Sequence, residues 1–170
     1  KLDFILQCAK GMEGRSNYHF LFLGSGAEKR NLLDLKEKLD LKNVTMLDPV
    51  SKLEVKRYIS ILDIALINLR KSELFTTVIP SKIFENAGME IPILMGVNGE
   101  AREIIESYHA GVCFEPESET EFCEKLDLLL TDENLYNECK EGCKKLSLDF
   151  DRNLLANKML QIITQINSGK

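Results

Sequence analysis

Pro80, Ser81 and Lys82 form a turn whose residue types suit binding of a negatively charged ligand. Pro80 restricts the residue before it to extended geometry, so Ser81 is expected to be the N-cap of a helix. Lys82 then falls in the first helical turn, where a cation opposes the helix dipole. An anion nearby would outweigh that effect through a charge-assisted hydrogen bond. The turn therefore predicts either an anion contact or, more simply, a lysine that extends into water.

Glu85 follows Lys82 by three residues and Ser81 by four, so the three side chains are expected near one end of that helix. A carboxylate accepts two hydrogen bonds, which suits the vicinal hydroxyls of a ribose. A surface ion pair between Lys82 and Glu85 is the simpler alternative.

Gly24, Ser25 and Gly26 follow an apolar run and precede a helical pattern. Glycines permit positive φ and a close approach to the backbone, while free N–H groups at a helix start attract anions. The third glycine of a dinucleotide fingerprint is missing, because the chain continues with Ala27 and Glu28. A nicotinamide dinucleotide site is therefore not supported, and a simple tight turn explains these glycines as well as phosphate binding does.

The elements that position these turns alternate along the chain. Short apolar runs predict buried strands at 18–24, 43–47, 63–69, 91–95 and 111–115. Helical patterns occupy 4–10, 28–40, 51–62, the stretch from 81, 98–110 and most of 118–166. Ser51 with Glu54, and Ser118 with Glu121, predict capped helix starts. This order predicts one α/β domain over 1–170: a Rossmann-like, doubly wound parallel sheet with helices on both faces and a helical C-terminal tail. Such sheets bind ligands at the carboxyl ends of their strands.

Composition excludes several classes of function. A net charge of −5 argues against nucleic-acid binding and against a polybasic membrane surface. No apolar run approaches the ~18 residues that span a bilayer, and no signal peptide is expected. The five scattered cysteines predict a reduced, cytoplasmic protein. Cys139 and Cys143 are four residues apart and are expected to be ordinary helix residues rather than half of a metal site.

The ordered segments resemble the C-terminal, donor-binding domain of family 4 (group 1) glycosyltransferases, which have the GT-B fold. The resemblance runs from about Leu2 to Ile163 and rests on the order of "FLFLGSGAEKRNL", "IPSKIFENAGMEIPIL", "GEAREIIE" and "AGVCFEPES". The Pro80-Ser81-Lys82 turn is most similar to that of the subgroup that builds bacterial surface polysaccharides such as capsule, O-antigen and lipopolysaccharide.

The resemblance implies binding of a nucleotide diphosphate sugar, a UDP-sugar above all, and transfer by a hexosyl- or N-acetylaminosugar transferase with retention of configuration. It implies no cofactor and no obligatory metal, because helix N-termini and basic side chains neutralise the diphosphate. The implied nucleotide-binding residues are Gly24, Ser25, Gly26, Ser81, Lys82 and Glu85, with Glu85 at the ribose. The implied donor-sugar contacts are Thr77, Asn98 and Gly99. The catalytic residues are not assigned.

Three departures from the family pattern qualify this resemblance. The first glutamate of the family motif lies eight residues before the second, where this chain has Thr77. Glu90 stands where many relatives have a glycine before Pro92. The first strand of the family domain, and the N-terminal domain that binds an acceptor glycan or lipid-linked glycan, are expected before Lys1. The 170 residues alone are therefore expected to be inactive, and a lipid-linked acceptor would bring the full-length protein to the inner face of the cytoplasmic membrane.

Two other functions fit parts of the sequence. A sugar-nucleotide epimerase shares the two-domain architecture, but its cleft would need carboxylates and histidines, and His19 and His109 are poorly placed for that role. A non-catalytic regulatory α/β module fits the acidic charge and Thr77. Loss of a bound nucleotide on mutation of Glu85 distinguishes a donor-binding domain from such a module.

Overall fold

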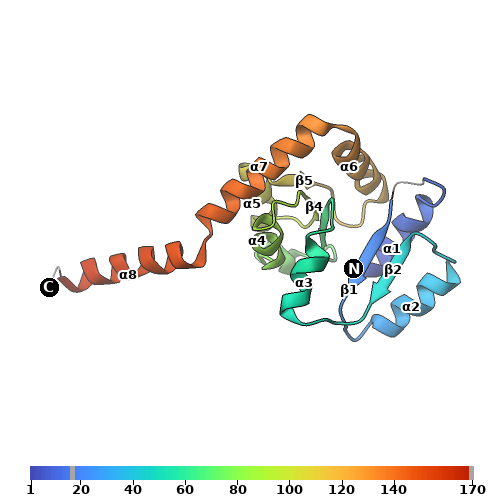
Figure 1. The fold of residues 1–170 in the computed structure, drawn as a ribbon, viewed down its shortest axis with the longest axis horizontal. Helices are drawn as coiled ribbons and strands as arrows, with labels where there is room; N and C mark the ends of the chain where they lie inside the picture. Colours follow the sequence, from blue (N-terminus) through green and yellow to red (C-terminus); the bar gives the residue numbers. More distant parts are fainter. Residues whose placement is uncertain (16–17, 169–170) are drawn as a thin grey trace.

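A computed structural model describes residues 1–15 and 18–168 (Figure 1). The strands are β1 (Phe20–Leu23), β2 (Val44–Leu47), β3 (Ala65–Asn68), β4 (Ile93–Gly96) and β5 (Gly111–Cys113). The helices are α1 (Leu2–Gly11), α2 (Lys29–Lys38), α3 (Lys52–Ile59), α4 (Lys82–Ala87), α5 (Glu100–Tyr108), α6 (Glu119–Thr131), α7 (Glu133–Asp149) and α8 (Arg152–Ser168). Each strand and helix predicted from the sequence is present. A short 3₁₀ helix, η1 (Glu73–Phe75), was not predicted.

All strand pairs are parallel, but the strands form two separate sheets. In the first sheet β1 pairs with β2, and Phe20 is opposite Val44. In the second sheet β4 lies between β3 and β5, and Ile93 is opposite both Ala65 and Gly111. Within the described residues, β1 and β3 are edge strands that do not pair with each other.

Helices cover both faces of the sheets, as the doubly wound prediction requires (Figure 1). The alternation of side chains along β4 separates the two sides. Ile93 and Met95 point into a core formed with α4, α5 and α7. Leu94 points the other way and packs with buried side chains of α1 and α6. The prediction of an α/β fold with helices on both faces is thereby confirmed.

Two of the predicted helix starts are capped by serines. Ser51 and Glu54 form both halves of a capping box at α3. At α6 the Ser118 hydroxyl accepts a hydrogen bond from Glu121 N. The Glu121 carboxylate instead accepts from Glu115 N at 2.8 Å, and so ties the end of the β5 strand to α6.

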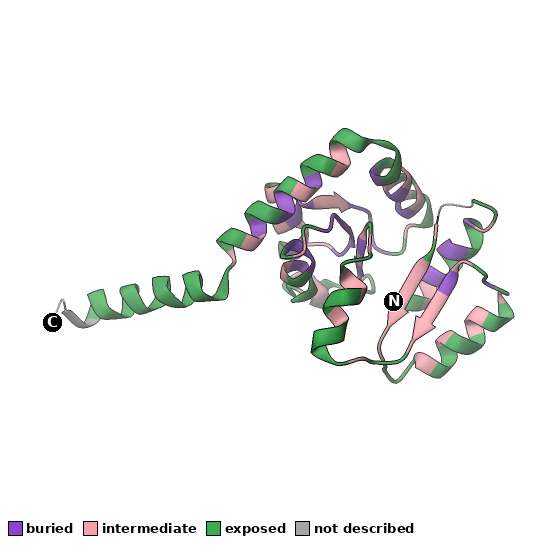
Figure 2. Cartoon of the chain, in the orientation of Figure 1, coloured by how far each residue is buried: buried purple, intermediate pink, exposed green. Residues whose placement is uncertain are grey.

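The C-terminal helix α8 projects away from the rest of the chain (Figure 1). Residues 152–166 are all exposed, as Figure 2 shows in green. Seven of them are large and apolar: Leu154, Leu155, Met159, Leu160, Ile162, Ile163 and Ile166. Across the described part of the chain, none of the helices combines the length and the apolar character needed to cross a bilayer.

Candidate functional site

The parallel strands bring several of the predicted site residues to one edge of the fold. Gly24 follows β1 directly, and Asn98 and Gly99 follow β4 after Val97. The start of α1 lies at the same edge, because Asn68 Nδ2 at the end of β3 donates a hydrogen bond to Lys1 O at 2.8 Å. This carboxyl edge is where open parallel sheets bind ligands.

A groove of about 560 Å³ separates the two sheets, and we call it the central groove. Its sides are the facing edges of β1 and β3, including Leu21, Leu23 and Leu66. Lys82 and Glu85 of α4 also line it. Lys82 and Glu85, the predicted cation and carboxylate, therefore line the same groove as β1, the strand that leads into the Gly24 turn.

Lys82 and Glu85 are both exposed. Among the described residues, the ion pairs that form include neither of them. The alternative of a Lys82–Glu85 surface pair is therefore not what the structure shows. Buried Asn86, the next residue, donates from Nδ2 to Lys82 O at 2.8 Å and fixes the helix backbone beneath the two charged side chains.

The predicted capping role of the Ser81 hydroxyl is wrong. Ser81 precedes α4, but its side chain makes no capping hydrogen bond and its backbone is helical, with φ −58° and ψ −25°. The reason is that the turn begins one residue earlier, where Pro80 O accepts from Ile83 N at 3.1 Å. A capping residue needs extended geometry to aim its oxygen at the helix N–H groups, and Ser81 lies inside the turn instead.

The glycine turn after β1 is open on its outer side. Gly24 has φ +142°, and a Cβ placed on Gly24 or Gly26 would meet no atom within 4 Å. Lys29, at the start of α2, reaches back to this turn and places its ammonium 3.2 Å from Gly24 O while pairing with Asp48. Sequence reasoning missed this cation, although its spacing from the glycines was a usable signal.

A second cavity of about 280 Å³, the strand-end pocket, lies where β3 and β4 end. Lys71, Thr76 and Asn98 are among the residues that line it. Lys71 Nζ lies 2.6 Å from Glu115 Oε1, and Asn98 Nδ2 donates to Glu115 Oε2 at 3.1 Å. The hydrogen bond from Lys71, followed by that from Asn98, lowers the pKa of Glu115. This network fixes Asn98, and the sequence alone did not indicate it because its members lie in three separate loops.

The other two predicted donor-sugar contacts, Gly99 and Thr77, differ in how close they lie to the strand-end pocket. Gly99 precedes α5 with φ +82°, and its neighbour Glu100 donates from N to Thr76 O at 2.9 Å. Thr77 is not among the residues that line either cavity, whereas Thr76 lines the strand-end pocket. The pocket thus includes Asn98 and touches the backbone beside Gly99, but it does not include Thr77.

Both histidines lie at the opposite edge, ahead of their strands. His19 precedes β1 and its Nε2 is 2.8 Å from Thr45 Oγ1. His109 precedes β5 and its Nδ1 is 3.3 Å from Glu138 Oε1. Neither is near the carboxyl ends of the strands, so nothing in their placement favours the epimerase alternative.

The five cysteines are all free, and Cys139 and Cys143 are buried in α7 as ordinary helix residues. Burial raises the pKa of Cys143 to about 12, and its Sγ lies 3.1 Å from Ala110 O. In residues 1–15 and 18–168 no cluster of three or more potential metal ligands is present.

Solved structures share this fold. A glycosyltransferase from Rickettsia africae superimposes with a TM-score of 0.75 at 19% identity, covering 98% of this chain and 45% of that one. WaaG, a glycosyltransferase involved in lipopolysaccharide biosynthesis, gives 0.74 at 20%, covering 96% and 43%. Anabaena Alr3699/HepE, solved in complex with UDP-glucose, gives 0.78 at 14%, covering 95% and 44%. The chain thus spans less than half the length of these proteins.

A search of curated protein sequences finds no match. The family described as glycosyl transferases group 1 matches residues 1–146, which include both cavities and every predicted site residue. A match over that much of the sequence, on a domain whose neighbours have the GT-B architecture, establishes that the chain belongs to the group 1 glycosyl transferases.

Proposed function

We propose that this chain is the donor-binding half of a glycosyltransferase that uses a nucleotide diphosphate sugar, with a UDP-sugar as donor. The observation that carries the proposal is the placement of Lys82 and Glu85. A cation and a carboxylate, each without an ion-pair partner among the described residues, line the groove beside the glycine turn. Such a pair suits a ligand that has both a phosphate and a diol.

Each side chain then has a distinct role. Glu85 accepts hydrogen bonds from the ribose hydroxyls, and Lys82 neutralises part of the diphosphate charge. The turn at Gly24, Ser25 and Gly26 offers backbone that a ligand can approach closely, because its outer side is open. The Ser81 hydroxyl, which makes no capping hydrogen bond, contributes to binding of the diphosphate.

The sugar end of the donor is proposed to lie at the strand-end pocket. Asn98 lines this pocket, and Gly99 packs against the backbone of Thr76, which also lines it. Thr77 follows Thr76 in the same loop. The amide of Asn98 is held by Glu115 and Arg102 and is thereby oriented before a ligand arrives.

The reaction is proposed to retain the anomeric configuration and to need no obligatory metal, with the acceptor, a glycan or lipid-linked glycan, bound by the other half of the protein. Two neighbours support a bacterial surface polysaccharide as product and UDP-sugar as donor: WaaG acts in lipopolysaccharide biosynthesis, and Alr3699/HepE binds UDP-glucose. We place the full-length enzyme in the cytoplasm, at the inner face of the membrane when its acceptor is lipid-linked.

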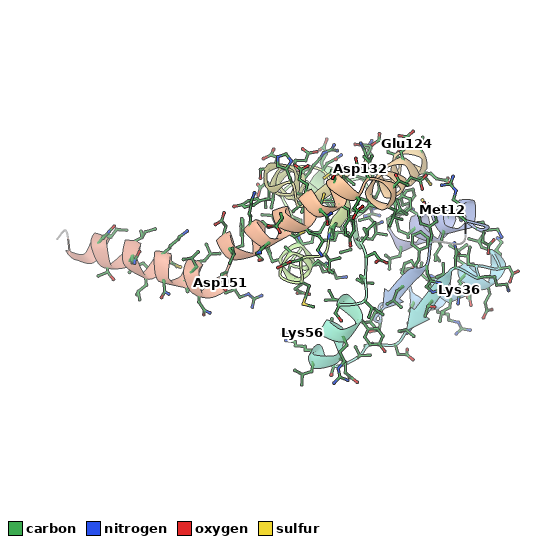
Figure 3. All side chains as sticks on the ribbon, turned by 45° about the horizontal axis from the view of Figure 1, so that its top comes forward. Met12, Lys36, Lys56, Glu124, Asp132 and Asp151 are labelled. Atoms are coloured by element: carbon green, nitrogen blue, oxygen red, sulfur yellow. The ribbon has the colours of Figure 1, made fainter. Side chains whose placement is uncertain are left out.

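Calorimetric titration of the full-length protein with UDP tests the donor site. Glu85→Gln is expected to weaken UDP binding about 10- to 100-fold, because it removes a charge-assisted acceptor, and Lys82→Ala about 10-fold. Glu124→Gln and Lys56→Ala are matched controls. Both residues are exposed, and they lie on α6 and α3, outside the residues that line either cavity (Figure 3).

Two results would overturn the proposal. One is folded full-length protein that binds no nucleoside diphosphate, and the other is equal affinity in the Glu85 and Glu124 variants. Repeating the titration with EDTA and with Mg²⁺ tests the metal: unchanged affinity is expected, and binding that needs Mg²⁺ contradicts that part of the proposal.

A further inference from the structure

The hydrogen-bond ladder between β1 and β2 lacks a backbone donor at its carboxyl end. Gly24 N donates to Leu47 O at 3.2 Å, which continues the pattern that begins with Phe20 N and Asn43 O. In a parallel ladder, the residue two positions after that acceptor donates its own N–H back to the Gly24 carbonyl. That residue is Pro49, which has no N–H. The backbone of β2 therefore cannot supply a donor to Gly24 O.

The Lys29 ammonium takes the place of the missing donor. Its Nζ lies 3.2 Å from Gly24 O and 3.5 Å from Leu47 O, and it forms an ion pair with Asp48. These three acceptors match the three hydrogens of an ammonium group. Lys29 thus differs from Lys82, which has no ion-pair partner among the described residues, because its hydrogens are already engaged by the protein. Its role in this arrangement is to hold the turn rather than to contact a ligand.

The direction of the Gly24 carbonyl fixes the direction of the next N–H. A trans peptide is planar, so its carbonyl and the N–H that follows point in opposite directions. Gly24 O points toward Lys29 on the side of β1 where β2 lies, because the same ammonium also reaches Leu47 O and Asp48. The Ser25 N–H therefore points to the other side of β1, where the central groove lies.

The turn that Lys29 holds has donors to offer. Ser25 and Gly26 are exposed, and within the described part of the chain neither N–H donates to another backbone group. Free N–H groups ahead of a helix attract anions. The groove toward which the Ser25 N–H points is also lined by Lys82 and Glu85. An anion beside Lys82 is thus on the same side of β1 as this donor.

We propose that Lys29 is a positioning residue of the donor site. By replacing the N–H that Pro49 lacks, its ammonium keeps the Gly24 carbonyl on the β2 side and directs the Ser25 N–H toward the diphosphate of the bound nucleotide. Asp48 holds the ammonium in place and offsets its charge. The assignment rests on the proposed function, because the diphosphate is the ligand of that function.

Amide NMR spectra of the ligand-free full-length protein, followed by UDP titration of the same variants, test this assignment. Lys29→Met removes the hydrogen bond to Gly24 O, so the Ser25 amide resonance is expected to shift and UDP affinity to fall about 10-fold. Lys29→Arg retains a charged donor and is expected to keep most of the wild-type affinity. Lys38→Met, at the exposed far end of α2, is the matched control and should change neither measurement.

Asp48→Asn separates positioning from direct contact with the ligand. It leaves the bond from Lys29 to Gly24 O in place, so UDP affinity is expected to stay the same or to fall. Tighter UDP binding in Asp48→Asn would overturn the proposal, since it would mean that the carboxylate competes with phosphate for the ammonium.

Two other results would also overturn it. One is a Ser25 amide resonance that Lys29→Met leaves in place, and the other is equal UDP affinity in the Lys29→Met and Lys38→Met variants. Wild-type protein that binds no UDP would instead contradict the proposed function, whereas the ligand-free spectra would still show whether Lys29 orients the turn.

Discussion

The backbones of Thr76 and Gly99 are in such close contact that Gly99 has no room for a side chain. A Cβ on Gly99 would lie 2.0 Å from Thr76 O, and the residue has φ +82°. The adjacent hydrogen bond from Glu100 N to Thr76 O, 2.9 Å long, holds the loop after η1 against the start of α5. Thr76 also lines the strand-end pocket.

Gly99→Ala is expected to lower the free energy of unfolding by about 1–3 kcal/mol, because the new methyl group meets backbone and its φ is unfavourable for alanine. Urea denaturation measures the change. Gly26→Ala is the matched control, since a Cβ there meets nothing within 4 Å and its φ is ordinary. Equal stability of the two variants would contradict the close packing of Gly99 on Thr76.

Glu90 adopts the left-handed conformation, with φ +56°, just after α4. Glu90→Gly is expected to raise the free energy of unfolding by roughly 0.5–1 kcal/mol, because glycine relieves the strain but gains freedom in the unfolded chain. Glu90→Ala retains the Cβ and should bring no such gain. A stabilisation shared by both variants would point to removal of the charge rather than to backbone strain.

Asp127 on α6 accepts hydrogen bonds from Tyr18 and Arg15, with Arg15 Nη1 2.8 Å from Oδ2. These hydrogen bonds lower the pKa of Asp127, and the one from the Tyr18 hydroxyl has a larger effect than the one from Arg15. Because the pKa of Asp127 in the folded state is below the unfolded value of about 3.9, its ionised carboxylate stabilises the folded state. This contribution is fully present above the unfolded pKa and is lost as pH falls through the folded pKa. Asp127 and Arg15 are partly exposed, so their interaction is expected to contribute at most about 1 kcal/mol to the free energy of unfolding.

Acid titration of unfolding free energy in wild type, Asp127→Asn and Tyr18→Phe measures this effect. The gap between wild type and Asp127→Asn should be constant above about pH 5 and should narrow below about pH 4. Tyr18→Phe should reproduce part of the loss. Curves for wild type and Asp127→Asn that stay parallel down to pH 2 would show that Asp127 does not titrate differently on folding.

Cysteine reactivity should follow burial. Cys123 is half-buried, whereas burial raises the pKa of Cys8 and of Cys113 to about 12 and of Cys139 to about 11. Because the thiolate is the reactive form, iodoacetamide is expected to label Cys123 first and the others only on unfolding. Mass spectrometry after limited labelling gives the order. Rapid labelling of Cys143 in folded protein would contradict the buried α7 interface.

The order of elements was predictable because short apolar runs alternate with helical patterns, and each run became a strand. The capping pair at Ser51 and Glu54 was predictable because both partners lie within one turn. The lack of a capping hydrogen bond from Ser81 was not predictable. The first hydrogen bond of this short helix is accepted by the Pro80 carbonyl, and no local sequence pattern indicates that. The Glu85 position followed from its spacing, and the donor role of Glu85 stays a prediction.

Long-range contacts account for most of what the sequence did not reveal. The network of Lys71, Asn98 and Glu115 joins the ends of three strands that are far apart in the chain. Lys29 reaches Leu47 O and Asp48, at the end of β2, because β1 and β2 are adjacent. Helical periodicity likewise predicted α8 but did not indicate that it would project from the domain with its apolar residues exposed.

Helix α1 packs on both sheets at once. Its Ile5 and Cys8, together with Met12 directly after the helix, belong to the cluster around Leu94 of the larger sheet. Its Leu6 and Ala9 pack with Val44 of the smaller one. Because no strand of the described chain bonds the two sheets together, this ten-residue helix is a main route by which unfolding of one sheet is coupled to unfolding of the other. Whether these residues melt in a single cooperative transition therefore depends largely on how firmly α1 is held.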